Sequence, residues 1–258
     1  MAPKRRILPV TGPPGAGKTT ALISLAAQHP QLARFGVRDF GLELARAGDP
    51  LGLRMRETLL RGGLVSDALV RREFRCFLDR LSGEVAAVAV EGYPRDPRQC
   101  RDFTEVVAAV DGELAGLVAV ELPDEEVRAR VVGRRICTRC GIPAPEGATA
   151  AAPAAGAAGA AMPAAGRPEE RCAACGGAVA PRDDDAEERL ARRLADYRTV
   201  SAGVRAYFRA RGLLHTVDGL RSPAQVRRHL LDLLLPTAAA SAAGAPPATR
   251  PDPEGGDT

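Results

Sequence analysis

The stretch GPPGAGKTT, residues 12–20, constrains the fold of this chain more than any other segment. It follows a short apolar run at residues 6–11 and precedes a stretch at residues 18–28 that predicts a helix. A glycine-rich turn between a strand and a helix lets backbone N–H groups approach phosphate oxygens, and the helix N-terminus adds partial positive charge. The pattern G-x-x-x-x-G-K-[ST] in this setting predicts a phosphate-binding loop, with contacts from Gly15, Ala16, Gly17, Lys18, Thr19 and Thr20.

Two kinds of side chain near this loop have predicted roles in binding ATP and its metal. Lys18 is expected to bridge the β- and γ-phosphates, and Thr19 or Thr20 to hold Mg²⁺. A carboxylate at the end of a second apolar strand commonly helps to hold this metal, usually through water. Glu91 directly follows the apolar run at residues 85–90, so we expect it to be this carboxylate rather than an unrelated acid at a strand end.

Apolar runs alternate with predicted helices along most of the chain. The runs at residues 85–90 and 117–122 are uniformly apolar, as strands of a buried parallel sheet are. This alternation predicts an α/β fold with a doubly wound parallel sheet and helices on both faces, and ligands bind at the carboxyl ends of such strands. The other predicted elements are helices at 39–61 (broken near 48–50), 66–81, 97–109, 124–135, 183–211 and 223–235, and a last strand at 213–217.

Composition excludes several classes of function. The net charge of the 258 residues is only +4 and aromatic residues make up 3%, so we expect no nucleic-acid partner. No apolar run approaches the roughly 20 residues that span a bilayer, so we expect no membrane association. The basic residues near the start precede an apolar stretch too short for a signal peptide, and we therefore expect a cytoplasmic protein. We also expect a monomer.

Four of the six cysteines form two Cys-x-x-Cys pairs. Without a secretion signal this spacing predicts a tetrahedral, structural Zn²⁺ site, with redox thiols or an iron–sulfur site as the alternatives. The ligands would be Cys137, Cys140, Cys172 and Cys175. Residues 143–171 between the pairs are rich in Ala, Gly and Pro and have no periodic apolar face, which predicts an insertion without a core of its own.

The segment EGYPRDPRQ, residues 91–99, together with the phosphate loop, resembles the adenylate kinase family, whose pattern is D-G-[FY]-P-R followed by Gln. Further matches follow in the family's order: GLVSDALV at 63–70, RVVGRRICTRCG at 130–141, CAACGG from Cys172, and PRDDDAEERLARRLADY from Pro181. The resemblance covers about residues 6–235 and implies a core of the P-loop NTPase type with a small zinc-bearing lid. The implied boundaries are a core at 1–135 and 183–235 with an acceptor-binding insert at about 36–65, a lid at 136–182, and a disordered tail at 236–258.

This resemblance implies an enzyme that reversibly transfers a phosphoryl group from ATP to a nucleoside monophosphate, with AMP as the expected acceptor. By position, Arg130 and Arg134 would lie at the ATP site, and Arg95 and Gln99 would bind the acceptor's phosphate and base. The full set of implied residues is Lys18, Arg95, Arg134, Arg182 and Arg193 for catalysis, Gly92, Val65, Arg182 and Arg193 for the acceptor, and Asp184 and Asp185 for the lid hinge.

The chemistry of this reaction agrees with the residue types. The acceptor is a phosphate oxygen that is already ionised, so no general base is required, and catalysis consists of positioning and charge stabilisation. Arginine suits this task because its planar fork binds phosphate bidentately and stays protonated.

The acceptor segment departs from the family's S-T-G-D-x-x-R pattern. Here it is FGVRDFGLE, in which Asp39 is retained but Val37 and Leu42 replace the threonine and the arginine. Arg38, in the place of the glycine, is a candidate replacement. Two alternatives therefore stay open: a P-loop kinase for another small acceptor, and a nucleotide-binding regulatory protein with little catalysis. The retained arginines favour a kinase.

Overall fold

The computed structural model describes residues 4–60, 65–131, 134–137, 171–172, 176–181 and 187–236. Several predictions fall outside these ranges: those for Cys140, Cys175, Arg182, Asp184 and Asp185, almost all of the 143–171 insertion, and the tail after Leu235 apart from Pro236.

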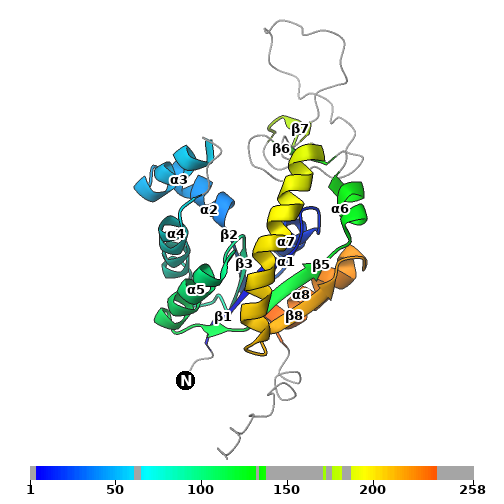
Figure 1. Cartoon of the computed structure of the whole chain (residues 1–258). Coiled ribbons are helices and arrows are strands. Elements are labelled where there is room, and N and C mark those ends of the chain that lie inside the picture. Colours follow the sequence, from blue (N-terminus) through cyan, green and yellow to red (C-terminus); the bar gives the residue numbers. More distant parts are fainter. Residues whose placement is uncertain are drawn as a thin grey trace, which may run out of the picture.

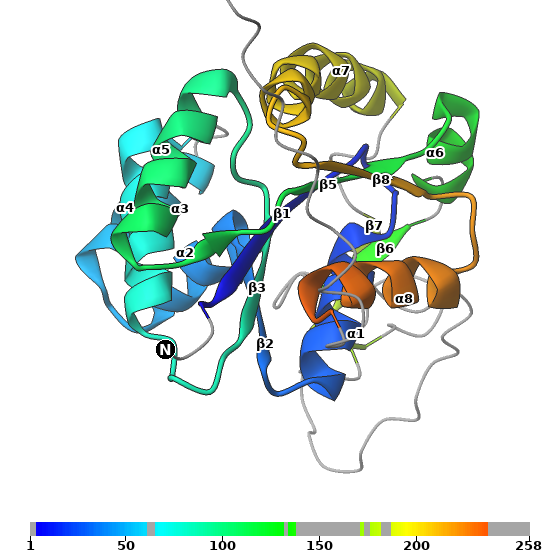
Figure 2. The ribbon, with the colours of Figure 1, turned by 90° about the horizontal axis from the view of Figure 1, so that it is seen from below.

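A parallel sheet forms the centre of the described part of the molecule (Figures 1 and 2). Its strand order is β2-β3-β1-β5-β8, with the short β4 paired to β1, and every pairing in it is parallel. Neighbouring strands are mostly not consecutive in sequence, so helices cross between them, as predicted for a doubly wound sheet. The strands are β1 (Arg6–Thr11), β2 (Leu32–Gly36), β3 (Ala87–Glu91), β4 (Glu113–Leu114), β5 (Leu117–Glu121) and β8 (Leu214–Asp218).

Helices cover both faces of this sheet, which confirms the predicted fold class (Figure 2). Because side chains alternate along a strand, Leu8 and Val10 point to one face and Ile7 to the other. The first face packs against α1 (Lys18–Gln28) and α8 (Pro223–Leu234). The second packs against α2 (Val37–Arg46), α4 (Asp67–Asp79), α5 (Pro97–Ala109) and α7 (Glu187–Arg209).

Four smaller elements complete the description. Helix α3 (Pro50–Leu60) packs against α2, and α6 (Asp124–Val131) follows β5. Strands β6 (Arg135–Cys137) and β7 (Val179–Pro181) form a separate antiparallel pair beyond one end of α7 (Figure 1). No helix within the described ranges is long and apolar enough to cross a membrane.

Pro9 lies in the central strand β1, although proline cannot donate to a sheet ladder. On one side β1 pairs with β4 through Ile7 and with β5 only from Val10 onward. The Ile7 carbonyl accepts from Ala115 on that side, and backbone groups two residues apart point the same way. The Pro9 nitrogen therefore faces the break between two partner strands, where its missing N–H removes little.

Two expectations about elements were wrong. Strand β2 was not expected, because its five residues include Arg34 and follow a helix without a clear turn signal. The helix expected over 124–135 ends at Val131, and the chain enters β6 at Arg135. Pairing of β6 with β7, about 44 residues later in the chain, is a non-local contact that helical periodicity does not reveal.

Candidate active site

The phosphate loop lies between β1 and α1 at the carboxyl edge of the sheet. Helix α1 begins at Lys18, and Gly17 before it has a φ of 73°. Gly15 also has a positive φ, of 77°, and a Cβ there would lie 2.9 Å from a Val131 methyl group and 3.7 Å from Arg130 Cβ. Helix α6 thus packs directly over a loop backbone that only glycine accommodates at this point. Arg130 stands beside the loop, where its Nε donates to Glu126 over 2.6 Å.

Lys18 folds back over this loop. Its Nζ donates to the carbonyl oxygens of Gly12 and Pro13, over 2.7 and 2.8 Å. The pKa of Lys18 is lowered to about 8, mainly by burial; Glu91 opposes this change, and the positive charges of Arg134, Arg193 and Arg95 add to it. The ammonium group is therefore less firmly protonated than an ordinary lysine.

Three arginines converge on Lys18 from separate elements. Arg95 follows β3, and its Nε donates to the Gly92 carbonyl over 2.9 Å. Arg134 precedes β6, and Arg193 lies in the N-terminal half of α7. All three are close enough to Lys18 to act on its pKa. The fold thus brings together residues as far apart in sequence as Lys18 and Arg193, and the result is a cationic site suited to polyanionic ligands.

Glu91 ends β3 beside the loop. Its Oε1 accepts from the Thr19 hydroxyl over 2.5 Å, and its Oε2 from Arg34 Nη2 over 2.7 Å. Of the two threonines expected near the metal, the structure places Thr19 against the carboxylate, whereas Thr20 is exposed. A hydroxyl and a carboxylate are oxygen ligands of the kind that Mg²⁺ prefers.

The residues expected on the acceptor side lie next to this edge. Gly92 has a φ of 87°, and a Cβ there would lie 3.5 Å from Arg95 Nη2 and 3.6 Å from Val37 Cγ2. Gln99 is 8% exposed, and its amide accepts from the Arg95 N–H over 2.8 Å and donates to Asp67 over 2.7 Å. Val65 packs against the aromatic cluster formed by Phe35, Phe74, Tyr93 and Phe103.

In the divergent acceptor segment, Arg38 is exposed on the first turn of α2 and Leu42 is half-buried. Arg34, just before this segment, lies inside the site, where it donates to Glu91. It was not among the predicted site residues because the strand that carries it, β2, was not predicted. Leu32, Arg34 and Gly36 alternate with Ala33 and Phe35, and this alternation could have indicated a strand.

One cysteine of each predicted zinc pair is described: Cys137 lies in β6, and Cys172 lies outside the β6–β7 sheet, next to an isolated bridge. Cys137 is 1% exposed and pairs in register with Val179, while a bridge joins Arg171, the neighbour of Cys172, to Ala178. The Cys172 N–H donates to Gly177 and the Cys172 carbonyl accepts from Gly176, which has a φ of 69°. This is a tight turn around a cysteine, compatible with a metal ligand. The described ranges contain no group of three metal-binding side chains, since two of the four cysteines lie outside them.

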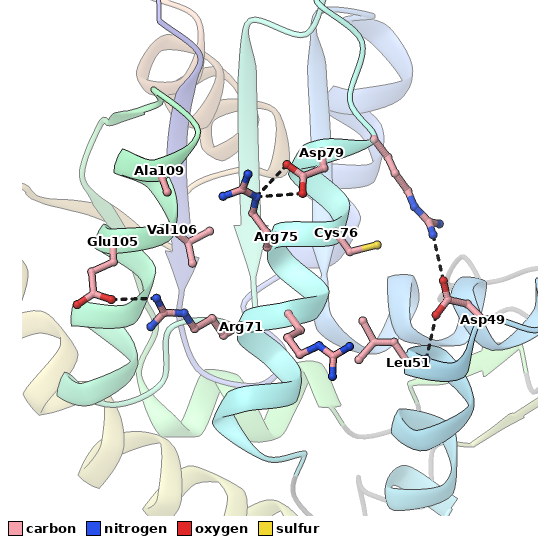
Figure 3. Close-up of a pocket in the computed structure, with 11 residues that line it drawn as sticks. Asp49, Leu51, Arg71, Arg75, Cys76, Asp79, Glu105, Val106 and Ala109 are labelled. Carbon is pink, nitrogen blue, oxygen red and sulfur yellow. Dashed lines mark hydrogen bonds and ion pairs between the residues drawn. The ribbon is translucent and has the colours of Figure 1, made fainter.

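A shallow pocket of about 620 Å³ lies elsewhere, between α4, α5 and the α2–α3 connection (Figure 3). Three of the arginines that line it pair with neighbouring acids: Arg71 with Glu105, Arg75 with Asp79 and Arg80 with Asp49. None of the residues expected to bind phosphate or acceptor lines this pocket, so we do not assign it to the same chemistry.

Comparisons with known proteins agree with this geometry. A family model described as adenylate kinase matches residues 10–213. An adenylate kinase of Symbiobacterium thermophilum is 33% identical over 81% of this chain and 88% of its own length. Those of Rhizorhabdus wittichii and Carboxydothermus hydrogenoformans are each 30% identical, over 86% and 84% of this chain and 96% and 94% of their own lengths.

Proposed function

The chain belongs to the adenylate kinase family and is a nucleoside monophosphate kinase, and we propose that the cations around Lys18 carry the family's reaction, reversible transfer of a phosphoryl group from ATP to AMP. The observation that supports this assignment is the convergence of Lys18, Arg95, Arg134 and Arg193 at the end of a phosphate loop. A binding protein has no use for so many cations around one transferable group.

In this proposal the side chains act by position and charge. Lys18 leaves the carbonyls of Gly12 and Pro13 and binds the β- and γ-phosphates, while the backbone of residues 15–20 surrounds them. Arg134 and Arg193, with Arg182 from outside the described residues, neutralise the charge that spreads over the transferring group. The attacking oxygen of the acceptor is already ionised, so no side chain has to remove a proton.

The acceptor binds between β3 and α2. Arg95 meets its phosphate, Gln99 exchanges its contacts with Arg95 and Asp67 for the base, and Gly92 and Val65 line the space. Asp184 and Asp185 serve as the hinge of the lid that closes over both nucleotides.

Two metals belong to the proposal. Adenylate kinases use Mg²⁺ with ATP, and here Thr19 and Glu91 would hold it, where it would offset phosphate charge. A structural Zn²⁺ would be held by the four cysteines of the lid, because the turn at Cys172 and the buried Cys137 suit thiolate ligands.

A coupled assay with all nucleoside monophosphates as acceptors tests the assignment. We expect turnover with AMP that depends on Mg²⁺ and falls by at least about 10²-fold in Lys18→Met and Arg193→Ala. Val37 and Leu42 favour one second candidate, a kinase for another acceptor. Robust turnover with a different acceptor and none with AMP would establish that candidate. ATP binding without turnover of any acceptor would establish a regulatory protein instead.

We place the enzyme in the cytoplasm as a monomer. A cysteine-ligated zinc requires reduced thiols, which the cytoplasm maintains. Sedimentation at micromolar concentration, with or without nucleotide, tests the monomer.

A further inference from the structure

Arg34 is a largely buried cation at the end of β2, with a side chain only 13% exposed. Its two terminal nitrogens bind different carboxylates. Nη1 lies 2.6 Å from Asp39 Oδ2, and Nη2 lies 2.7 Å from Glu91 Oε2. Burial alone would lower the pKa of Arg34, but the charges and hydrogen bonds of these two acids outweigh it and raise the pKa. The planar fork of arginine is the group that can hold two carboxylates at once.

The two carboxylates belong to different halves of the active site. Glu91 also accepts the Thr19 hydroxyl of the phosphate loop, over 2.5 Å. Asp39 lies in the first turn of α2, the helix that begins the acceptor segment. A continuous series of contacts, Thr19–Glu91–Arg34–Asp39, therefore joins the ATP side of the site to the acceptor side.

The backbone leaves room for this bridge at Gly36. A Cβ on Gly36 would lie 3.0 Å from Arg34 Nη2 and 3.1 Å from Asp39 Oδ2. Any side chain at this position would crowd both partners of the ion pair. Because Gly36 precedes α2 directly, the same residue that starts the acceptor helix also accommodates the bridge.

We propose that Arg34 is a positioning residue for the acceptor, which fixes the start of α2 to Glu91 and neutralises Asp39 beside the incoming phosphate. The inference rests on the proposed function. Leu42 stands where the family's acceptor segment carries an arginine, so this segment has no cation at that position to hold an anionic acceptor. Without Arg34, Asp39 and Glu91 would repel each other and the acceptor phosphate. The start of α2, where Val37 lies next to Gly92, would then no longer be held in place by an ion pair.

Calorimetric titration of AMP, without ATP or metal, tests this role directly. We expect Arg34→Gln to weaken AMP binding on the order of tenfold, the loss typical of a charge-assisted contact, and ATP binding by less than about twofold. In steady state, KM for AMP should rise more than KM for ATP. Arg228→Gln, which removes the same charge from an exposed site on α8, on the other face of the sheet, serves as the control and should leave AMP binding unchanged.

A double-mutant cycle with Asp39→Asn identifies the mechanism. In Arg34→Gln, Asp39 is an uncompensated charge, so adding Asp39→Asn should restore part of the lost AMP affinity. Arg34→Lys keeps the charge but reaches only one acid, and should bind AMP with intermediate affinity. Thermal unfolding will show whether Arg34→Gln folds. If it does not, Arg34→Lys replaces it in the binding measurements.

Two results separate the inference from the function on which it rests. If the wild-type enzyme phosphorylates AMP but Arg34→Gln, or Arg34→Lys in its place, binds AMP like the Arg228 control, Arg34 has no positioning role. Strict additivity of the Arg34 and Asp39 substitutions would also overturn it. If the wild-type enzyme does not phosphorylate AMP at all, the proposed function itself is wrong.

Discussion

Lys18 shows how a phosphate site is prepared before its ligand arrives. In this structure its ammonium group is satisfied by two loop carbonyls, yet it lies among three arginines that favour its neutral form. The repulsion within this cluster is relieved when phosphates enter, because their negative charge offsets the positive charge of the cations. The cost of holding the cations together is part of what makes the site select a polyanion.

The lowered pKa of Lys18, about 8, predicts that ATP binding takes up a proton at alkaline pH. At pH 9 most of Lys18 is neutral in the free enzyme, and bound phosphates raise its pKa and protonate it. At pH 6.5 Lys18 is already protonated, so uptake at this residue should vanish. Calorimetry in buffers of different ionisation enthalpy measures the uptake, which should approach about one proton at pH 9. Lys18→Met should show none, and equal uptake in this variant would contradict the assignment.

Glu73 is a second residue whose state is set by its surroundings. It is completely buried in α4, and neither of its oxygens has a hydrogen-bond partner within the described part of the chain. A Cβ on Gly41 would lie 3.2 Å from its Oε1, so Glu73 lies against the backbone of α2. The pKa of Glu73 is raised to about 9, mainly by burial; the Gly41 backbone acts in the opposite direction, and the nearby charge of Asp39 adds to the increase.

Glu73 should therefore make folding less favourable as pH rises from about 4.5 to about 9. In this window the unfolded chain releases the proton that the folded protein keeps. We expect Glu73→Gln to be more stable than wild type by about 1–3 kcal/mol at pH 8, with a smaller difference at pH 5. Urea unfolding across this range measures it, with the exposed Glu84→Gln as control. A difference that does not change with pH would show that Glu73 is ionised in the folded protein.

At the scale of elements, the β6–β7 pair is too small to be stable alone. It contributes three residues from each strand and is separate from the main sheet. Two short strands bury little apolar surface, and isolated pairs of this kind are marginal in water. A metal bound between the cysteine turns would supply the missing stability.

We therefore expect one zinc per chain by mass spectrometry of the metal content. Removing it with a chelator should lower Tm by several degrees, because the metal's contribution to folding is lost. Cys172→Ser should lose the metal, whereas Cys76→Ser, on α4, should retain it. A metal-free protein with an unchanged Tm would rule out a structural zinc.

At the scale of the whole molecule, α7 runs from beside the β6–β7 pair to the opposite end of the parallel sheet (Figure 1). Near its start Leu190 and Leu194 pack against Val127 of α6, and near its end Phe208 packs against Leu117. Arg193 lies between Leu190 and Leu194 in sequence, so its position depends on how α7 packs against its neighbours. Between these two contacts α7 approaches α5 closely at Gly203, where a Cβ would lie 2.9 Å from Pro97.

Gly203→Val should push α7 away from α5. We expect a loss of about 1–3 kcal/mol in the free energy of unfolding, typical of overpacking, together with a lower kcat because Arg193 shifts. The control is Ala202→Val, which places the same side chain on the exposed side of the same helix and should cost only about 0.5 kcal/mol. Urea unfolding and the coupled assay measure both effects. Equal losses in the two variants would mean that the close approach at Gly203 is unimportant.

The sequence by itself determined the phosphate loop, the parallel α/β sheet and the family. Each rests on local information, namely a nine-residue motif, uniformly apolar strands and short motifs in a fixed order. The role of a glycine such as Gly15 can be predicted from the sequence, because the backbone conformation that glycine permits is a local property.

Tertiary structure alone decided which charges meet. The bridge of Arg34 to Asp39 and Glu91, the position of Pro9 at a change of partner strand, and the unpartnered Glu73 against Gly41 all depend on contacts between elements. Neither helical nor strand periodicity carries information about such neighbours, because it describes which face a residue occupies and not what lies opposite. The divergent acceptor segment could be recognised in the sequence, but the cation that supports it became visible only when β2 was placed beside β3.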